Sequence, residues 1–236
     1  MNLCAVAGML GNAMICLFAI EEKFMATTKN FLRRYTDLPA LIHLLRTASV
    51  TFLDPSSWDD KNDAYFMNLY KEKTGLTTLL AICCSMESET YHQWRVFSNG
   101  PSGVCISFKR QELIDVLEAN EAVRSGEVKY LKIKQLKTSN AAIDEMPFLK
   151  RAPYGPEHEF RFIYESKTTR LRSKTYPVPL RCIDKIYLSP WMPEVVADSV
   201  RDTLKEIRGV SSIRILHSTL IRNDQWQSYG NRIAQL

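Results

Sequence analysis

The sequence LLAICCS at residues 79–85 is an apolar run of strand length bounded by polar residues. A run this short and this apolar predicts a buried strand. Working outward, VCISF at residues 104–108 has the same character and follows a clear turn signal, SNGPSG. By similar reasoning we predict further strands at residues 31–35, 50–53, 128–136, 159–164, 183–188 and 213–216, and helices after Asp37 and at residues 64–72, 89–97, 111–117 and 193–207.

Strands and helices are mixed along the chain without a strict strand-helix-strand repeat, and no long Pro/Gly/Ser linker divides it. We therefore expect one α+β domain over residues 25–236, with a mixed, mostly antiparallel central sheet flanked by helices. Residues 1–20 carry no charge, and Met25 opens a natural-looking start, MATTKNFLRRYTD. We interpret residues 1–24 as an extension from an early start codon, with a membrane anchor at residues 1–20 as the second reading and a secretion signal as the third.

The cysteines favour a cytoplasmic protein. Six cysteines are present, and none of them shows the two-residue gap of a zinc knuckle or a redox motif, so we expect reduced thiols. The net charge of +5 is uneven, because residues 124–185 hold fourteen Lys/Arg against seven Asp/Glu. Such a region can attract the phosphates of a nucleotide or a nucleic acid, or form a solvated face.

Three clusters could carry chemistry. In EHEFR, Glu157, Glu159 and Arg161 alternate along a predicted strand and share one face, where charges must be paired if they are buried. Arg34 and Tyr35 end the first strand just before a helix start, where arginine can hold phosphate or carboxylate. The alternatives are a structural ion pair and a basic surface patch.

The third cluster surrounds Trp94, which is either a plug in the core or a platform for a ligand. Acidic residues crowd the loop that contains Asp60, and with Glu159 they could bind Mg²⁺ or act only as turn formers. The histidines have no partners at zinc spacing, and no Gly-x-Ser-x-Gly elbow occurs. We therefore expect no metal.

The ordered series FLRRYTD, FLDPSSWDDKND, CCSMES, YHQWRVF, GVCISF, VKY, FLKRAPYGPEHEFRF and IDKIYLSP resembles the bacterial family called domain of unknown function 2971. The resemblance runs from about residue 31 to about residue 220. It matches the family's Lys-Tyr to Arg34 and Tyr35, and its Met-Trp to Gln93 and Trp94. The family's Glu-x-Glu-Trp-Arg motif matches Glu157, Glu159, Phe160 and Arg161. Of the family's Phe-Asn-Asp-Pro loop, only the aspartate is retained, as Asp60.

The layout of this family is similar to that of ADP-ribosyltransferases, with a late strand that carries one glutamate. The resemblance implies an NAD-using transferase, a toxin or phage-defence effector acting on a protein or nucleic-acid target. Glu159 would stabilise positive charge on the ribose, and Arg161 would hold Glu159 in place. Arg34 would hold the pyrophosphate, Tyr35 and Trp94 would stack on a ring, and Asp60 would complete the cofactor site.

Two other classes of function stay open. In a metal-dependent nuclease, Asp60 and Glu159 would hold Mg²⁺ beside a basic face. A non-catalytic module would instead use residues 124–185 to bind nucleic acid or a protein partner.

Overall fold

The computed structural model describes residues 30–98 and 100–235, so the predicted extension at residues 1–24 lies outside the described residues. The strands are β1 (Phe31–Asp37), β2 (Ser49–Leu53), β3 (Thr78–Ser85), β4 (Gly103–Lys109), β5 (Val123–Glu127), β6 (Lys129–Leu131), β7 (Leu149–Arg151), β8 (Glu159–Ser166), β9 (Ser173–Pro177), β10 (Ile183–Leu188) and β11 (Arg214–His217). The α-helices are α2 (Leu38–Thr47), α3 (Lys61–Lys73), α4 (Tyr91–Phe97), α5 (Arg110–Glu118), α6 (Ile133–Thr138), α7 (Glu194–Lys205) and α8 (Asp224–Ile233).

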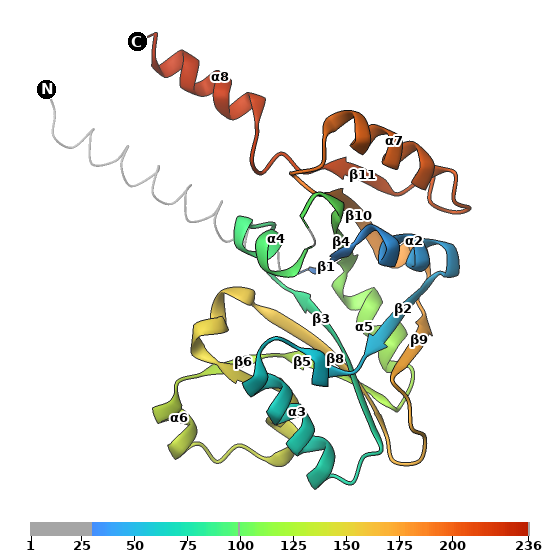
Figure 1. Ribbon diagram of the computed structural model, residues 1–236, viewed down its shortest axis with the longest axis vertical. Helices are drawn as coiled ribbons and strands as arrows, with labels where there is room; N and C mark the ends of the chain where they lie inside the picture. Colours follow the sequence, from blue (N-terminus) through green and yellow to red (C-terminus); the bar gives the residue numbers. More distant parts are fainter. Residues whose placement is uncertain (1–29, 99, 236) are drawn as a thin grey trace, which may run out of the picture.

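Across residues 30–98 and 100–235, nine strands form one sheet, whose path runs β11-β10-β4-β1-β3-β2-β9 with β8 beside β3 and β5 beside β8. Its pairs are antiparallel except for β10 and β11, which run parallel. A second, small sheet pairs β6 with β7 in parallel. The predicted α+β class with a mixed, mostly antiparallel central sheet is therefore confirmed (Figure 1).

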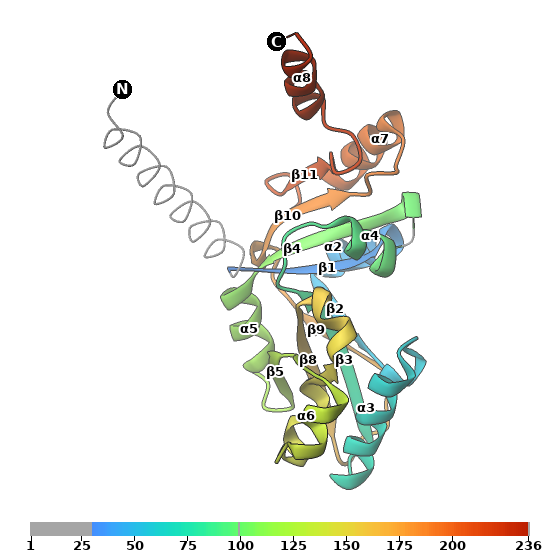
Figure 2. The ribbon, with the colours of Figure 1, turned by 90° about the vertical axis from the view of Figure 1, so that its left-hand side faces the viewer.

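The large sheet has two parts that meet at one point. β1 pairs with β4 along its whole length, and β3 pairs with β8 along its whole length. Between β1 and β3, by contrast, the register joins Arg33 to Ser85 at the end of β3. Figure 2 shows β1 and β4 running across the direction of β3 and β8. The junction brings residues of β1, β3 and β8 together.

The two faces of β8 have different roles. Phe160 and Phe162 are buried in the larger apolar core. Ile163 points to the other face and joins a smaller core with Met67 and Tyr70 of α3. This is the alternation that the sequence predicts, because successive side chains of a strand point to opposite faces. The face of β8 that carries Glu159 and Arg161 therefore looks toward α3.

Helix caps fix the segments on either side of the junction. The Asp37 carboxylate accepts a hydrogen bond from the backbone N–H of Ala40 at 2.9 Å, which confirms the predicted start of α2. The Asp60 carboxylate accepts a bond from the N–H of Asn62 at 3.0 Å and caps α3. Such caps satisfy N–H groups that the helix itself leaves without partners.

Several predicted elements differ from the structure. Residues 128–136 do not form one strand: β6 ends at Leu131, and Ile133 and Leu136, three residues apart, lie on the short helix α6. Over so short a segment, the alternation of lysines with apolar residues fits the period of a helix as well as that of a strand. β9 replaces the predicted loop because it pairs with β2. β5 and α8 are absent from the prediction. For β5 the reason is its sequence, VRSGE, which is polar and contains glycine.

Over the described ranges, no helix is both long enough and apolar enough to cross a bilayer. Cys83, Cys84, Cys105 and Cys182 are free thiols.

Candidate functional site

Tyr35 of β1 and Glu159 of β8 line the same cavity, which has a volume of about 310 Å³. β3 pairs with both strands, and Ser85 is the register partner of Arg33 on one side and of Glu159 on the other (Figures 1 and 2). We call this hollow the junction cavity. It is lined by Arg33, Tyr35, Trp58, Asp59, Asp60, Asp63, Cys83, Cys84, Ser85, Val96, Phe97, Lys150, Tyr154, Glu157 and Glu159.

Arg161 does not line the cavity itself but holds Glu159 in place. Its Nε donates to Oε1 of Glu159 at 2.7 Å, and its Nη2 donates to Oε2 at 2.9 Å. Nη1 and Nη2 donate to the two carboxylate oxygens of Asp63, at 3.0 and 2.8 Å, and Nη1 also donates to the carbonyl of Pro147 at 2.7 Å. Arg161 is completely buried, and these bonds occupy all its N–H groups. The ring of Trp58 covers the guanidinium face, with its centre 4.7 Å from Cζ of Arg161.

Lys150 of β7 is a second cation in the cluster. Its Nζ lies 2.5 Å from Glu157, 3.3 Å from Glu159 and 3.6 Å from Asp63. It also lies 4.9 Å from the centre of the Tyr154 ring. With its side chain only 9% exposed, Lys150 ties together three carboxylates that come from α3 and from the segment leading into β8. A buried charge of this kind is tolerated only when it is paired.

These contacts set the protonation of the cluster. Burial by itself raises the pKa of Glu159, but Arg161 and Lys150 outweigh it and lower the pKa to about 2. Burial raises the pKa of Glu157, although Lys150 partly offsets this effect. Burial lowers the pKa of Lys150, but Glu159, Glu157 and Asp63 outweigh it and the pKa is raised. At neutral pH the wall of the cavity therefore holds an ionised Glu159 in a fixed orientation.

A chain of hydrogen bonds anchors Tyr35. Its hydroxyl donates to Oε1 of Gln93 at 2.9 Å, and Nε2 of Gln93 donates to the hydroxyl of Ser85 at 2.6 Å. Ser85 in turn donates to the backbone carbonyl of Glu157 at 2.8 Å. Burial raises the pKa of Tyr35, so the phenol stays neutral. The chain links β1 and α4 to the entrance of β8.

Trp94 lies behind Tyr35 and does not line the cavity. Its ring is completely buried and meets the Tyr35 ring edge-on, with centroids 5.3 Å apart. Its Nε1 donates to the Glu89 carboxylate at 2.7 Å. In this structure Trp94 therefore supports Tyr35 by packing.

Arg33, rather than Arg34, is the arginine of β1 that lines the junction cavity. Neighbouring side chains on a strand point to opposite faces, so Arg34 shares the face of Leu32, a residue of the larger core. Nη1 of Arg34 is buried and has no hydrogen-bond partner among the described atoms. Burial lowers the pKa of Arg34. Arg33 is nearly buried, and its Nη1 donates to the carbonyl of Glu87 at 2.8 Å.

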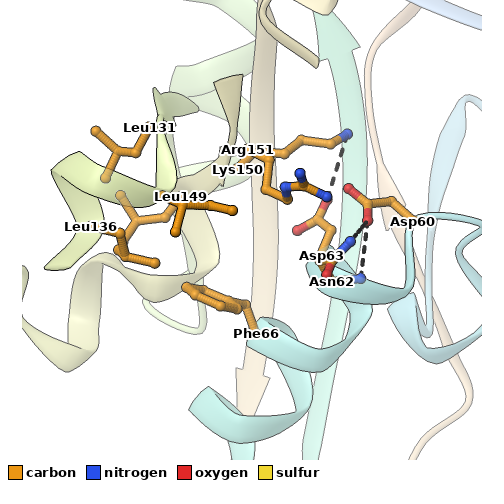
Figure 3. A pocket seen from close by; sticks show the side chains of 10 residues that line it. Asp60, Asn62, Asp63, Phe66, Leu131, Leu136, Leu149, Lys150 and Arg151 are labelled. Atoms are coloured by element: carbon orange, nitrogen blue, oxygen red, sulfur yellow. Dashed lines mark hydrogen bonds and ion pairs between the residues drawn. The ribbon is translucent and has the colours of Figure 1, made fainter. Parts of the chain in front are cut away.

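Asp60 borders two cavities. Besides the junction cavity it lines a neighbouring one of about 290 Å³, which is drawn in Figure 3. One of its oxygens caps α3, whereas Oδ2 is buried without a partner. Figure 3 shows Asp60 on the same side of this second cavity as Asp63 and Lys150.

Three carboxylates of the junction cavity, those of Asp63, Glu157 and Glu159, are already paired with Arg161 or Lys150. Both oxygens of Glu159 receive bonds from Arg161, and Oε2 also lies near Lys150. Where the chain is described, no group of three or more His, Cys, Asp and Glu side chains is arranged to hold a metal ion. Mg²⁺ between Asp60 and Glu159 would compete with two cations that are built into the fold.

The basic stretch at residues 124–185 does not form a single surface. Arg161 and Lys150 are buried in the cluster. Arg124 pairs with Glu165 at 3.0 Å, and Lys129 pairs with Glu145 at 2.7 Å. Part of the positive charge in this stretch therefore balances carboxylates, in the buried cluster and in partly exposed pairs.

The structure brings Tyr35, Asp60, Glu159 and, behind it, Arg161 to one place. From the basic cluster before the first helix and from the acidic loop it adds Arg33 and Asp63, and it adds Lys150, which the sequence does not indicate as a site residue. Asp63 belongs to the acidic loop and helix start that the sequence shows, but its partner lies 98 positions away. Lys150 carries no local signal, because it is one of many lysines in a basic stretch.

Comparison with known proteins gives one family. Residues 93–162 match the family DUF2971, described as a protein of unknown function, which confirms the resemblance over that stretch. No curated protein matches the chain. The chain is similar to DarT of Thermus sp. 2.9 in complex with ADP-ribosylated ssDNA, with 12% identity, a TM-score of 0.43, and coverage of 80% of this chain and 94% of that one. For DarT in complex with NAD+, the identity is 10%, the TM-score 0.42, and the coverage 80% and 96%.

Proposed function

We propose that this protein is an NAD-consuming enzyme of the ADP-ribosyltransferase type. The observation that carries the proposal is the ionised Glu159, held by Arg161 on the wall of a cavity that it shares with Tyr35. A fixed carboxylate stabilises positive charge that develops on a sugar carbon when a glycosidic bond breaks. The proposal rests on this geometry within the chain.

The charge of the junction cavity favours a cationic ring. Its lining contains five carboxylates, from Asp59, Asp60, Asp63, Glu157 and Glu159, and two cations, from Arg33 and Lys150. Aromatic side chains of the lining include Tyr35, Trp58, Phe97 and Tyr154. The nicotinamide ring of NAD is a planar N-alkylpyridinium cation, and such cations are attracted both to carboxylates and to aromatic faces.

The proposed step is cleavage of the bond between nicotinamide and the ribose C1′. Both electrons of the bond leave with nicotinamide, which departs neutral, while positive charge passes to the ribose. Glu159 would lie beside this charge and would not need a proton transfer to act, since its pKa is lowered to about 2. An oxygen or nitrogen of the acceptor then bonds to C1′ and releases its proton to solvent.

The other residues would take supporting roles. Tyr35 would face the nicotinamide or its ribose, and Trp94 would hold Tyr35 from behind. Arg161 would keep Glu159 in position. A role of Arg34 in holding the pyrophosphate would require its side chain to reach past the strand, and Arg33 is better placed for it. Asp60 would lie at the border of the site.

The test measures NAD cleavage by the purified full chain without added metal. Glu159→Gln should lower the rate at least about 100-fold, because the amide carries no charge to oppose the developing cation. Glu165→Gln is the matched control: this carboxylate lies on the same strand and also pairs with an arginine, Arg124, but it does not line the cavity. Equal NAD cleavage by Glu159→Gln and the wild type would sink the proposal.

We also propose that the ADP-ribose acceptor is a protein or a nucleic acid, and that the activity is toxic to bacterial cells. Induced expression of the wild type should then arrest growth, whereas Glu159→Gln expressed to the same level should not. Labelled NAD would mark the acceptor fraction, and digestion with protease or nuclease would identify its class. Growth that is unaffected by an NAD-cleaving wild type would contradict the toxin role alone.

A further inference from the structure

The cavity next to the proposed reaction site has a different chemical character. Figure 3 shows it with its apolar side chains gathered on one side and its charged and amide side chains on the other. We call it the apolar cavity. Its apolar lining comes from α3, β6, α6 and β7, namely Phe66, Leu131, Ile133, Leu136 and Leu149.

The two cavities adjoin, because Asp60, Asp63 and Lys150 line both of them. Asp63 is held by the two bonds from Arg161, so the charge at this border is fixed in place. Arg151 lines the apolar cavity next to Lys150, and its side chain is exposed. Lys150 is already paired with Asp63, Glu157 and Glu159, whereas Arg151 is an exposed cation beside this border.

Neither cavity alone is large enough for a dinucleotide. Their volumes are about 310 and 290 Å³. Sites for small molecules usually have volumes of about 300 to 1,000 Å³, and a dinucleotide is a large member of this class. Taken together, the two cavities offer the space of a mid-sized site, with Asp60, Asp63 and Lys150 at the border between its two parts.

We infer that the apolar cavity binds the adenosine half of NAD, and that its diphosphate lies beside the exposed guanidinium of Arg151. This inference rests on the proposed function. The three parts of NAD match the three zones by charge. The cationic nicotinamide suits the carboxylate-rich junction cavity, the uncharged adenine suits the apolar cavity, and the anionic diphosphate suits Arg151.

Two substitutions test this assignment, both at partly exposed positions of the apolar cavity. Phe66→Ala removes an aromatic side chain of α3, and Leu136→Glu places a negative charge on α6, where the leucine is 39% exposed. Tyr65→Ala is the matched control, because Tyr65 is the neighbouring aromatic residue on α3 and does not line either cavity. Circular dichroism would verify that each variant is folded.

Binding of ADP-ribose, AMP and nicotinamide mononucleotide to the full chain is then measured by calorimetry. Phe66→Ala and Leu136→Glu should each weaken ADP-ribose and AMP binding about ten-fold, which corresponds to about 1.4 kcal/mol. Nicotinamide mononucleotide should bind both variants within about two-fold of the wild type, and Tyr65→Ala should change nothing.

If the folded variants retain the wild-type affinity for ADP-ribose and AMP while the wild type cleaves NAD, the adenosine assignment is wrong and the proposed function stands. A wild type that neither binds nor cleaves NAD overturns both. If Phe66→Ala does not fold, Leu136→Glu decides alone, since it adds charge at an exposed helix position without emptying the core.

Discussion

Arg161 of β8 and Asp63 of α3 form a paired, two-bond contact at 3.0 and 2.8 Å across 98 positions of sequence. Nε and Nη2 of the same guanidinium hold Glu159. A helix and a strand are thereby locked together by the side chain that orients the proposed catalytic carboxylate. The proposed function and the stability of the fold would both depend on one buried cation, and each can be tested separately.

Replacing Arg161 with lysine should be severely destabilising. A lysine cannot make two parallel bonds to each of two carboxylates, so Glu159 or Asp63 would stay buried without its full complement of partners. We expect the free energy of unfolding to fall by about 3 to 5 kcal/mol. Urea denaturation measures this loss. Arg124→Lys, at the partly exposed pair with Glu165, should cost less than about 1 kcal/mol. Similar losses in the two variants would contradict the special role of Arg161.

The stability that Glu159 contributes should depend on pH in the acidic range. Its pKa is about 2 in the folded protein against 4.5 ordinarily, so ionisation favours folding. The contribution is complete above about pH 4.5 and is lost as the pH falls toward 2, and its full size is on the order of 3 kcal/mol. The wild type should therefore exceed Glu159→Gln in unfolding free energy at pH 6, with a smaller difference at pH 3. Urea titrations at both pH values measure the difference in unfolding free energy between the two proteins. A difference that is the same at pH 6 and pH 3 would rule out a lowered pKa of Glu159.

Asp60 can be tested for its cap separately from any role in binding. Asp60→Ala should lower the unfolding free energy by about 1 kcal/mol, because the first turn of α3 loses its acceptor. Asp60→Asn keeps an oxygen at the cap and should be close to the wild type in stability. If Asp60→Asn nevertheless changes NAD affinity, measured by calorimetry, the unpartnered Oδ2 takes part in binding. Equal stability of all three proteins would contradict the capping role.

The ring and the hydroxyl of Tyr35 can be tested separately. Tyr35→Phe keeps the edge-on contact with Trp94 but leaves Oε1 of Gln93 without its donor, which should cost about 1 kcal/mol of stability. If the ring faces nicotinamide, Tyr35→Phe should keep NAD affinity within about two-fold, whereas Tyr35→Ala should lower it about ten-fold. Calorimetry with NAD distinguishes the two, and an unaltered affinity in Tyr35→Ala would remove Tyr35 from the binding site.

The sequence alone was sufficient to predict an element where its local pattern fits one type of secondary structure. The apolar runs at residues 79–85 and 104–108 are buried strands, and the alternation in β8 separates Phe160 and Phe162 from Glu159 and Arg161. It was insufficient at β6 and α6, where a few residues fit two periods, and at β9, which is a strand because β2 lies beside it. A strand at the edge of a sheet depends on its partner more than on its own composition.

What the sequence determined by itself is the α+β class and the presence of a charged face on β8, because burial patterns repeat along each element. Only the tertiary structure decided that Arg33 rather than Arg34 reaches the cavity, since that choice depends on which face of β1 turns toward β8. It also decided that Asp63 and Lys150 join Glu159. Pairing between buried charges is set by distance in space, and residues far apart in the chain leave no local pattern of their future contact.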